Sequence, residues 1–375
     1  MSLAAVLCAQ PDPIQRLPRP DRAGTAHAVR VADLPLVFTS AIAAPTPGGS
    51  VGEEAGRALE ALGELLRESG SELGRVVRLQ AYVAADADVA AVEAVVAQRW
   101  AAAPVALTVV RSPLEVAGAR VAWEAVAAAG SAARAGVVRP GKAAVLPAGG
   151  KVFISGQAEK GGDVASAVRE TMAGLQRTLT HLGLSTQDVV QVKAFITPFA
   201  DHAVAAREVT ASFAGRPAPP LVQMEWVSGT LPVEIELVAT ARGMATPPGD
   251  RVAYLGLPWL APSPRYSKAC HVGAGVPLIF FGAVDGDGVS GAREQMKAIF
   301  ERIGSGLLEA GGSYRNLVKA TYYLGDATSR AVLGDIRGVY FDPTRAPAAS
   351  ALEVRSLGRP GRTAQIDLIG FPVKP

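Results

Sequence analysis

The sequence contains little cysteine and little histidine. Its two cysteines among 375 residues, Cys8 and Cys270, form no CxxC pair and match no zinc spacing, so we expect two free thiols in a reducing compartment. The four histidines, at positions 27, 181, 202 and 271, also lack the spacing of a metal site. No phosphate-binding loop or dinucleotide fingerprint occurs either. We therefore expect a protein without a metal or any other cofactor.

A large excess of one charge and a long apolar run are also absent. The 37 basic and 34 acidic residues leave a net charge of only +3, which gives no general attraction to nucleic acid or to an anionic membrane. No run reaches the roughly 18 apolar residues of a membrane span. The start, MSLAAVLCAQPDP, lacks the basic region and the apolar length of a signal peptide. With 49% hydrophobic residues, the composition is typical of a globular chain, and we expect a cytoplasmic protein.

The most informative feature that is present is a sequence segment that occurs in three similar copies, each of which we call a phrase. They are VVRLQAYV (76–83), VVQVKAFI (189–196) and LVKATYYL (317–324). Their starts lie 113 and 128 residues apart, which is the period of a domain and not the roughly 20–50 residues of a solenoid repeat. Runs rich in β-branched residues suit buried strands. The sequence therefore predicts three tandem domains that share one fold.

Each phrase lies in the same order of predicted elements. In the middle copy, apolar residues step by three and four between Asp163, a candidate helix cap, and Gly183, a candidate stop. The order of that copy is strand, helix, strand, helix, strand, strand, at 151–156, 163–182, 189–196, 201–214, 221–226 and 232–241. The other copies repeat it, and segments rich in proline and glycine lie between the copies. We predict domains at 20–131, 140–243 and 262–375, the first of them the most degenerate.

Several of these phrases resemble the reactive intermediate deaminase (Rid, or YjgF) family, to which the label endoribonuclease L-PSP is also attached. The matching phrases are FISGQ (153–157), VVQVKAFI, RPAPP (216–220), VEIELVATA (233–241), LVKATYYL, RAPAASALEV (345–354) and QIDLIG (365–370). The resemblance implies an α+β fold with a mixed sheet packed on two helices, as in the trimeric chorismate mutases. It also implies homotrimers with ligand clefts between subunits. Three copies in one chain would then form an intramolecular pseudo-trimer, and we expect a monomer.

The resemblance also implies a chemistry, the hydrolysis of a reactive 2-imino or enamine acid to a 2-keto acid and ammonia. That reaction needs a carboxylate to orient water, a cation to hold the substrate carboxylate, and polar groups at the imine nitrogen. Acids occupy the matching position of the final strand in all three copies, as Glu124, Glu236 and Asp367. The alternative is that each is a solvent-facing residue of an alternating strand.

The arginine that the family places before the penultimate strand is missing. Ala106, Pro219 and Ala349 occupy its position, and none of them can hold a carboxylate by charge. Arg345 or Arg362 could replace it, from a segment that also contains Arg355 and Arg359, although these could equally be solvated loop residues. The DGDG turn at 285–288 is no calcium loop, because Met296 stands where the glutamate ligand belongs.

Other family-matching residues are unevenly distributed. Ser155 and Gly156 keep the turn that contacts ligand in the family, whereas the first copy has Ser40 and Ala41. Tyr266 matches a cleft tyrosine that the family contributes across the subunit interface, although it could be a packed linker residue. We therefore expect the working clefts to involve the second and third copies.

Two functions remain open from the sequence. One is a divergent deaminase, or a related hydrolase, that acts on a small imine- or keto-acid-like ligand. The other is a binding or scaffold protein of the same fold without catalysis, which the loss of the arginine favours. Ribonuclease activity is disfavoured, because the sequence lacks a basic surface interleaved with aromatic residues.

Overall fold

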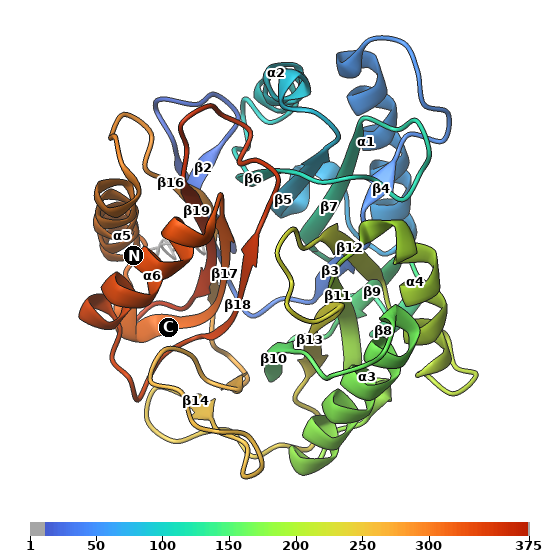
Figure 1. Ribbon diagram of the computed structural model, residues 1–375, viewed down its shortest axis with the longest axis vertical. Coiled ribbons are helices and arrows are strands. Elements are labelled where there is room, and N and C mark those ends of the chain that lie inside the picture. Colours follow the sequence, from blue (N-terminus) through green and yellow to red (C-terminus); the bar gives the residue numbers. More distant parts are fainter. Residues whose placement is uncertain (1–11, 374–375) are drawn as a thin grey trace, which may run out of the picture.

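The computed structural model describes residues 12–373. Within this range it contains three β-sheets and six α-helices (Figure 1). Figure 1 shows the strands gathered toward the centre of the molecule and the helices around the outside in three pairs. The predicted α/β fold of tandem, similar units is confirmed. No helix in the described range is long and apolar enough to cross a membrane.

The first sheet comes from one continuous segment, residues 36–146, with the strand order β6-β5-β7-β3-β9-β8 and β4 paired to β7. Its elements are β3 (Leu36–Thr39), β4 (Ile42–Ala43), α1 (Val51–Glu68), β5 (Val76–Val83), α2 (Val89–Arg99), β6 (Ala106–Arg111), β7 (Val121–Ala128), β8 (Gly136–Arg139) and β9 (Ala143–Leu146). Helix α1 begins at a capping box in which Ser50 and Glu53 bond each other's backbone.

The second sheet comes from residues 151–272, with the equivalent order β12-β11-β13-β10-β15-β14. Its elements are β10 (Lys151–Gln157), α3 (Val164–His181), β11 (Val189–Ile196), α4 (His202–Ala211), β12 (Leu221–Glu225), β13 (Val233–Thr240), β14 (Val252–Leu255) and β15 (Ala269–Val272). Asp163 caps α3, as predicted, and Gly183 follows its end with a φ of +73° that favours glycine.

The third sheet joins two distant parts of the chain, in the order β1-β2-β16-β19-β17-β18. Its elements are β1 (Ile14–Pro18), β2 (Ala26–Val31), β16 (Leu278–Asp285), α5 (Ala292–Glu309), β17 (Leu317–Leu324), α6 (Ala327–Tyr340), β18 (Ala348–Glu353) and β19 (Ala364–Gly370). We call residues 14–31 the ring-closing hairpin. Because strand pairing does not show which segments fold as units, the domains at 20–131, 140–243 and 262–375 remain a prediction.

The three sheets share a core, because their inner faces pack against one another. Phe38, Phe153 and Phe280, on the first strand of each unit, lie in one buried cluster. Tyr82, Phe195 and Tyr323, on the central strands, lie in a second. The outer face of each sheet packs on its own helix pair in a separate cluster. Both faces of every sheet are therefore covered, and a polar residue on an inner face is removed from solvent.

Three crossings, the chain segments that connect one sheet to the next, meet at Asp33. Asp33, between β2 and β3, accepts hydrogen bonds from the backbone amides of Gly149 (3.0 Å) and Gly275 (2.6 Å) in the other two crossings. Its carboxylate also pairs with the Nζ of Lys151 at 2.8 Å, and the Lys151 side chain is only 1% exposed. One carboxylate thus links all three crossings.

Candidate ligand clefts between the sheets

The three acids predicted on the final strands lie inside the molecule, between the sheets. Glu124 on β7, Glu236 on β13 and Asp367 on β19 are each less than a tenth exposed. Each pairs with a base on the central strand of the next unit. Glu124 lies 2.8 Å from Lys193, and Asp367 lies 2.8 Å from Arg78. Glu236 pairs with Lys319. The three contacts form a cyclic series of ion pairs that joins every unit to its neighbour.

Further hydrogen bonds occupy these carboxylates. The Tyr82 hydroxyl donates to Glu124 and the Tyr323 hydroxyl donates to Asp367. Burial opposes ionisation of Glu124, but Lys193 and Arg78 outweigh it and hold the pKa of that carboxyl below its usual value. Because the acids are paired and buried, their contacts favour a structural role. Water orientation by Glu124, Glu236 or Asp367 remains a prediction.

Ser155 and Gly156 lie where the second unit meets the third. The Ser155 hydroxyl donates to the Ser267 carbonyl at 2.6 Å and accepts from the Ala349 amide at 2.8 Å. Glu234 covers Gly156, since a Cβ on that glycine would lie 1.9 Å from the Glu234 Oε1. Beside it, the Ser350 hydroxyl donates to Glu236. The structure thus brings together the predicted Ser155, Gly156 and Glu236 in a cluster of side chains at the contact of the second and third units, which we call the serine cleft.

Glu234, which no sequence pattern marked, is the acid of the serine cleft whose pKa is raised. Burial raises its pKa to about 7, a hydrogen bond with Ser350 opposes this, and the neighbouring Glu236 adds to it. Alternation along β13 places Glu234 and Glu236 on one face of the strand. A carboxyl group with a pKa near 7 can both donate and accept a proton at neutral pH.

The other predicted residues of this region have different surroundings. The Tyr266 hydroxyl accepts a hydrogen bond from the Lys268 Nζ at 2.8 Å, and its ring packs on the core of the third unit. Arg345 pairs with Asp250 and lies over the ring of Tyr254, 4.7 Å from its centre. These contacts hold the Arg345 guanidinium at the β14 edge of the second sheet, away from Ser155 and Glu236.

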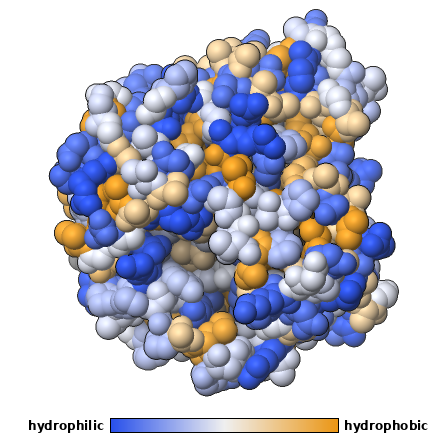
Figure 2. All heavy atoms as spheres, in the orientation of Figure 1, coloured by the Kyte–Doolittle hydropathy of each residue, from blue (hydrophilic) through white to orange (hydrophobic). Residues whose placement is uncertain are grey.

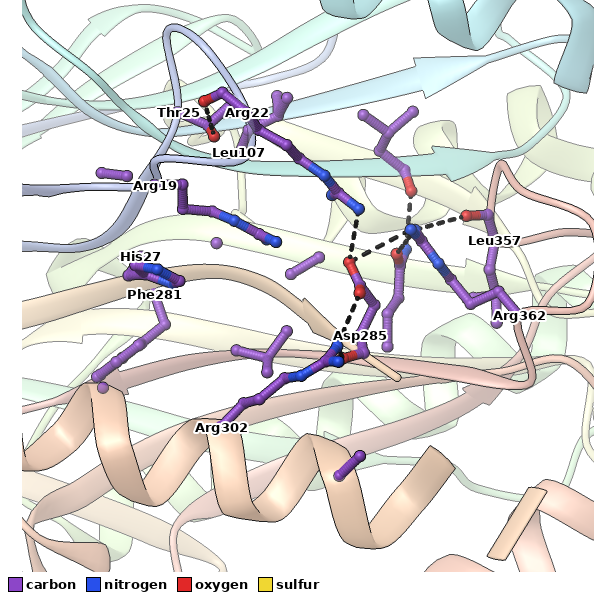
Figure 3. Close-up of a pocket in the computed structure, with 18 of the residues that line it drawn as sticks. Arg19, Arg22, Thr25, His27, Leu107, Phe281, Asp285, Arg302, Leu357 and Arg362 are labelled. Carbon is purple, nitrogen blue, oxygen red and sulfur yellow. Dashed lines mark hydrogen bonds and ion pairs between the residues drawn. The ribbon is translucent and has the colours of Figure 1, made fainter. Parts of the chain in front are cut away.

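Arg362 belongs to a different cleft, a cavity of about 460 Å³ between the third and first units (Figure 3). Arg22 of the ring-closing hairpin, Arg302 of α5 and Arg362 of the loop before β19 converge there on Asp285 (Figure 3). Arg22 lies 3.0 Å from an Asp285 oxygen and Arg362 lies 3.3 Å from it. We call this cavity the arginine cleft.

The charges of the arginine cleft are unevenly distributed. Asp287, next to Asp285, pairs with Arg22 at 2.9 Å and with Arg362 at 2.6 Å. Three guanidinium groups thus face two carboxylates. Burial lowers the pKa of Arg22, Asp285 opposes this, and the neighbouring arginines 19, 362 and 359 lower it further. The Arg22 end is therefore electropositive, whereas Glu93, Glu301 and Glu309 line other parts of the cavity.

The register of the strands allows the positions predicted for the missing family arginine to be compared among the three copies. Thr321 pairs with Ser350, and its equivalents Gln80 and Lys193 pair with Thr108 and Val222. The residues before those partners are Ala349, Leu107 and Leu221. By this register, the equivalents of Ala349 in the first and second copies lie one and two residues after Ala106 and Pro219, whose assignment to the arginine position remains a prediction. None of the three is an arginine, and Leu107 lines the arginine cleft.

Another cavity, of about 430 Å³, lies between the first and second units. Tyr82, Lys142 and Gln223 line it together with mostly aliphatic side chains. The hydroxyl of Tyr82 points from this cavity to Glu124 in the ion-pair series. The clefts around the molecule thus differ in chemistry, as the three unequal copies of the sequence would imply.

Several cleft residues gave no signal in the sequence. Arg19 and Arg22 lie between β1 and β2, whereas Arg302 lies on α5, and only the fold brings them near Arg362. Asp285 lies in the DGDG turn, where its partners are arginines. Among residues 12–373 no group of side chains is arranged to hold a metal ion. Cys270 is a buried free thiol, as predicted, and Cys8 lies outside the described residues.

Comparison with known proteins agrees with the fold. The model of the family described as endoribonuclease L-PSP matches residues 141–241 and 260–370, together more than half of the chain. The RutC family protein slr0709 of Synechocystis is 41% identical over 63 residues, which cover 17% of this chain and 48% of that relative. The chain thus spans about half the length of this curated relative.

Solved structures of the same family are also similar to parts of the chain. NMB1025 of Neisseria meningitidis, a YjgF family protein, is 26% identical, with 32% of this chain and 94% of that one covered and a TM-score of 0.25. YyfA of Yersinia pestis, of the Rid family, is 25% identical, and the match covers 25% of this chain and 79% of that one with a TM-score of 0.24. On the match of the family model, this chain belongs to the endoribonuclease L-PSP (Rid/YjgF) family and carries its domain in repeated copies.

Proposed function

We propose that this protein binds a small organic anion, such as a short-chain carboxylate, in the arginine cleft. The observation that carries the proposal is the convergence of Arg22, Arg302 and Arg362 at one end of this cavity, where Asp285 and Asp287 are their carboxylate partners. A guanidinium group is well suited to hold a carboxylate through two parallel hydrogen bonds. An anion at the Arg22 end would also reduce the repulsion among the arginines.

The shape of the cleft supports a small ligand with an apolar part. A volume of about 460 Å³ is in the range of small-molecule sites. Among the described residues, only the Nη2 atom of the Arg22 side chain has a polar contact, so its Nε and Nη1 remain available to a ligand. The walls include Leu107, Val109 and Phe281, which suit a short hydrocarbon chain.

Binding by the arginine cleft can be tested by calorimetry with pyruvate and 2-oxobutyrate. Arg22→Gln should weaken binding at least tenfold, because it removes a charge-assisted contact. Arg207→Gln is the matched control, since Arg207 is 67% exposed on α4 and, among residues 12–373, pairs only with Glu208. Absence of binding to the wild-type protein, or equal binding by the Arg22 variant, would overturn the proposal.

A second candidate function is hydrolysis of a 2-imino or enamine acid in the serine cleft. The observation that favours it is Glu234, whose pKa of about 7 suits proton transfer, beside Gly156 and Ser155. Lys319, paired with Glu236, is the cation of this region in place of the missing arginine.

The hydrolysis can be tested by generating 2-iminopropanoate and 2-aminoacrylate with an amino-acid-converting enzyme. The protein should speed their conversion to keto acid in competition with semicarbazide trapping, and Glu234→Gln should abolish the acceleration. The control is Glu60→Gln, at an exposed position of α1. An unchanged rate in the Glu234 variant would remove that residue from the mechanism, and no acceleration by the wild type would reject the activity.

A further inference from the structure

The ring-closing hairpin differs from the two equivalent hairpins in how the chain reaches it. β8 begins at Gly136, soon after β7 ends at Ala128, and β14 begins at Val252, soon after β13 ends at Thr240. Each of these hairpins completes the sheet that it follows. β2, by contrast, ends at Val31 and pairs with β16, which begins at Leu278 (Figure 1). The chain between them runs through the whole first and second units.

The ring-closing hairpin is held on two sides. β2 pairs with β16 from Val31 opposite Leu278 to Ala28 opposite Phe281. Toward the first unit, the Ala26 amide donates to the Val105 carbonyl at 2.8 Å. The hairpin thus joins the rest of the third sheet to the first unit. It reaches β16 by strand pairing, without a short covalent connection to it.

Arg16 fastens the same hairpin to the first unit. Its guanidinium donates to the carbonyls of Val76 (2.9 Å), Pro104 (2.7 Å) and Gly74 (3.0 Å). Arg16 does not line the arginine cleft. Its contacts therefore report on hairpin docking independently of any ligand.

The arginine cleft is complete only when this hairpin is docked. Arg19, Arg22, Thr25, Ala26 and His27 of the hairpin line it, opposite Arg302 of α5 (Figure 3). Arg22 reaches across to Asp285 and Asp287 of the third unit. An anion that touches both Arg22 and Arg302 can bind only the docked state.

We propose that the ring-closing hairpin is a strap, and that its docking on β16 and anion binding in the arginine cleft stabilise each other. The inference rests on the proposed anion-binding function and adds its regulation. Coupling of this kind is reciprocal, since a ligand that binds only one of two states shifts the population toward it. Opening of the strap would release the anion and remove the contacts that the hairpin makes with β16.

Amide hydrogen exchange on the full chain, with and without pyruvate, tests the coupling. At ten times the dissociation constant, exchange through strap opening should slow about elevenfold for residues 26–31 and 278–281. The matched amides of β9 (Ala143–Leu146) and β15 (Ala269–Val272) should exchange at the same rate with and without pyruvate. Without pyruvate, residues 26–31 should exchange faster than both matched strands.

A variant that loosens the strap outside the cleft provides a second readout. Arg16→Ala should speed exchange of residues 26–31 at least several-fold and leave β9 unchanged. Arg139→Ala, in the hairpin of the first sheet, should leave residues 26–31 unchanged. If pyruvate binds by calorimetry but the amide exchange of residues 26–31 does not change, the proposed coupling is wrong and the proposed function still holds. No pyruvate binding at all would overturn the proposed function and the coupling with it.

Discussion

Replacing Glu234 by glutamine should change how the stability of the protein depends on pH. The carboxyl group of Glu234 is partly buried over Gly156, and its pKa rises from an ordinary 4.5 to about 7 in the folded protein, mainly through burial and then through Glu236. The folded state therefore holds a proton that the unfolded chain releases. A glutamine of the same shape carries no such proton.

The sign and size of the effect follow from proton linkage. Because the folded-state pKa is the higher one, the stabilisation by this group is complete below pH 4.5 and is lost as the pH rises to 7. A shift from 4.5 to about 7 corresponds to a change of up to ~3 kcal/mol in the free energy of unfolding. Above pH 7 the contribution should be constant.

Urea unfolding followed by circular dichroism between pH 4.5 and 8 measures this difference. The wild type minus Glu234→Gln difference in unfolding free energy should fall by up to ~3 kcal/mol across this range. Glu60→Gln, at an exposed position of α1, is the control and should give a constant difference. A wild type minus Glu234→Gln difference that does not vary with pH would refute the reasoning.

Three further variants or measurements test other parts of the structure. Asp33→Ala should lower the unfolding free energy by about 3–5 kcal/mol, because it leaves the buried Lys151 unpaired. Asp335→Ala, which removes an exposed ion pair, should lower it by under about 1 kcal/mol. Equal losses in urea unfolding would argue against the role of Asp33 in joining the connecting segments. Gly156→Ala should displace the Glu234 carboxyl and flatten the pH dependence described above, and an unchanged profile would contradict that placement. Light scattering on a sizing column should give the mass of a monomer, and a trimer of full chains would disagree with the intramolecular arrangement.

The repeated element order was predictable because local patterns carry it. A helix stripe with steps of three and four, a β-branched run and the caps at Asp163 and Gly183 are all local, and each was found at the predicted place. The ring-closing hairpin was not predictable. Its strand β2 pairs with residues more than two hundred positions away, and no local pattern marks that partner.

The candidate sites were predicted only in part, for a reason that lies in the sheets. Alternation identified the face that Glu236 and Asp367 share with their strand neighbours, but not whether that face meets water or another sheet. Here the inner faces meet one another, so these acids became members of a buried ion-pair series. The arginine cleft combines segments near residues 22, 302 and 362, and such convergence depends on the tertiary fold.

A calorimetric titration of pyruvate into the wild-type protein and Arg22→Gln is the most direct test of anion binding by the arginine cleft. Because the clefts differ in chemistry and one of them carries the converging arginines, we predict one site per chain, lost in the variant. Three sites per chain, or one site that Arg22→Gln leaves intact, would contradict it.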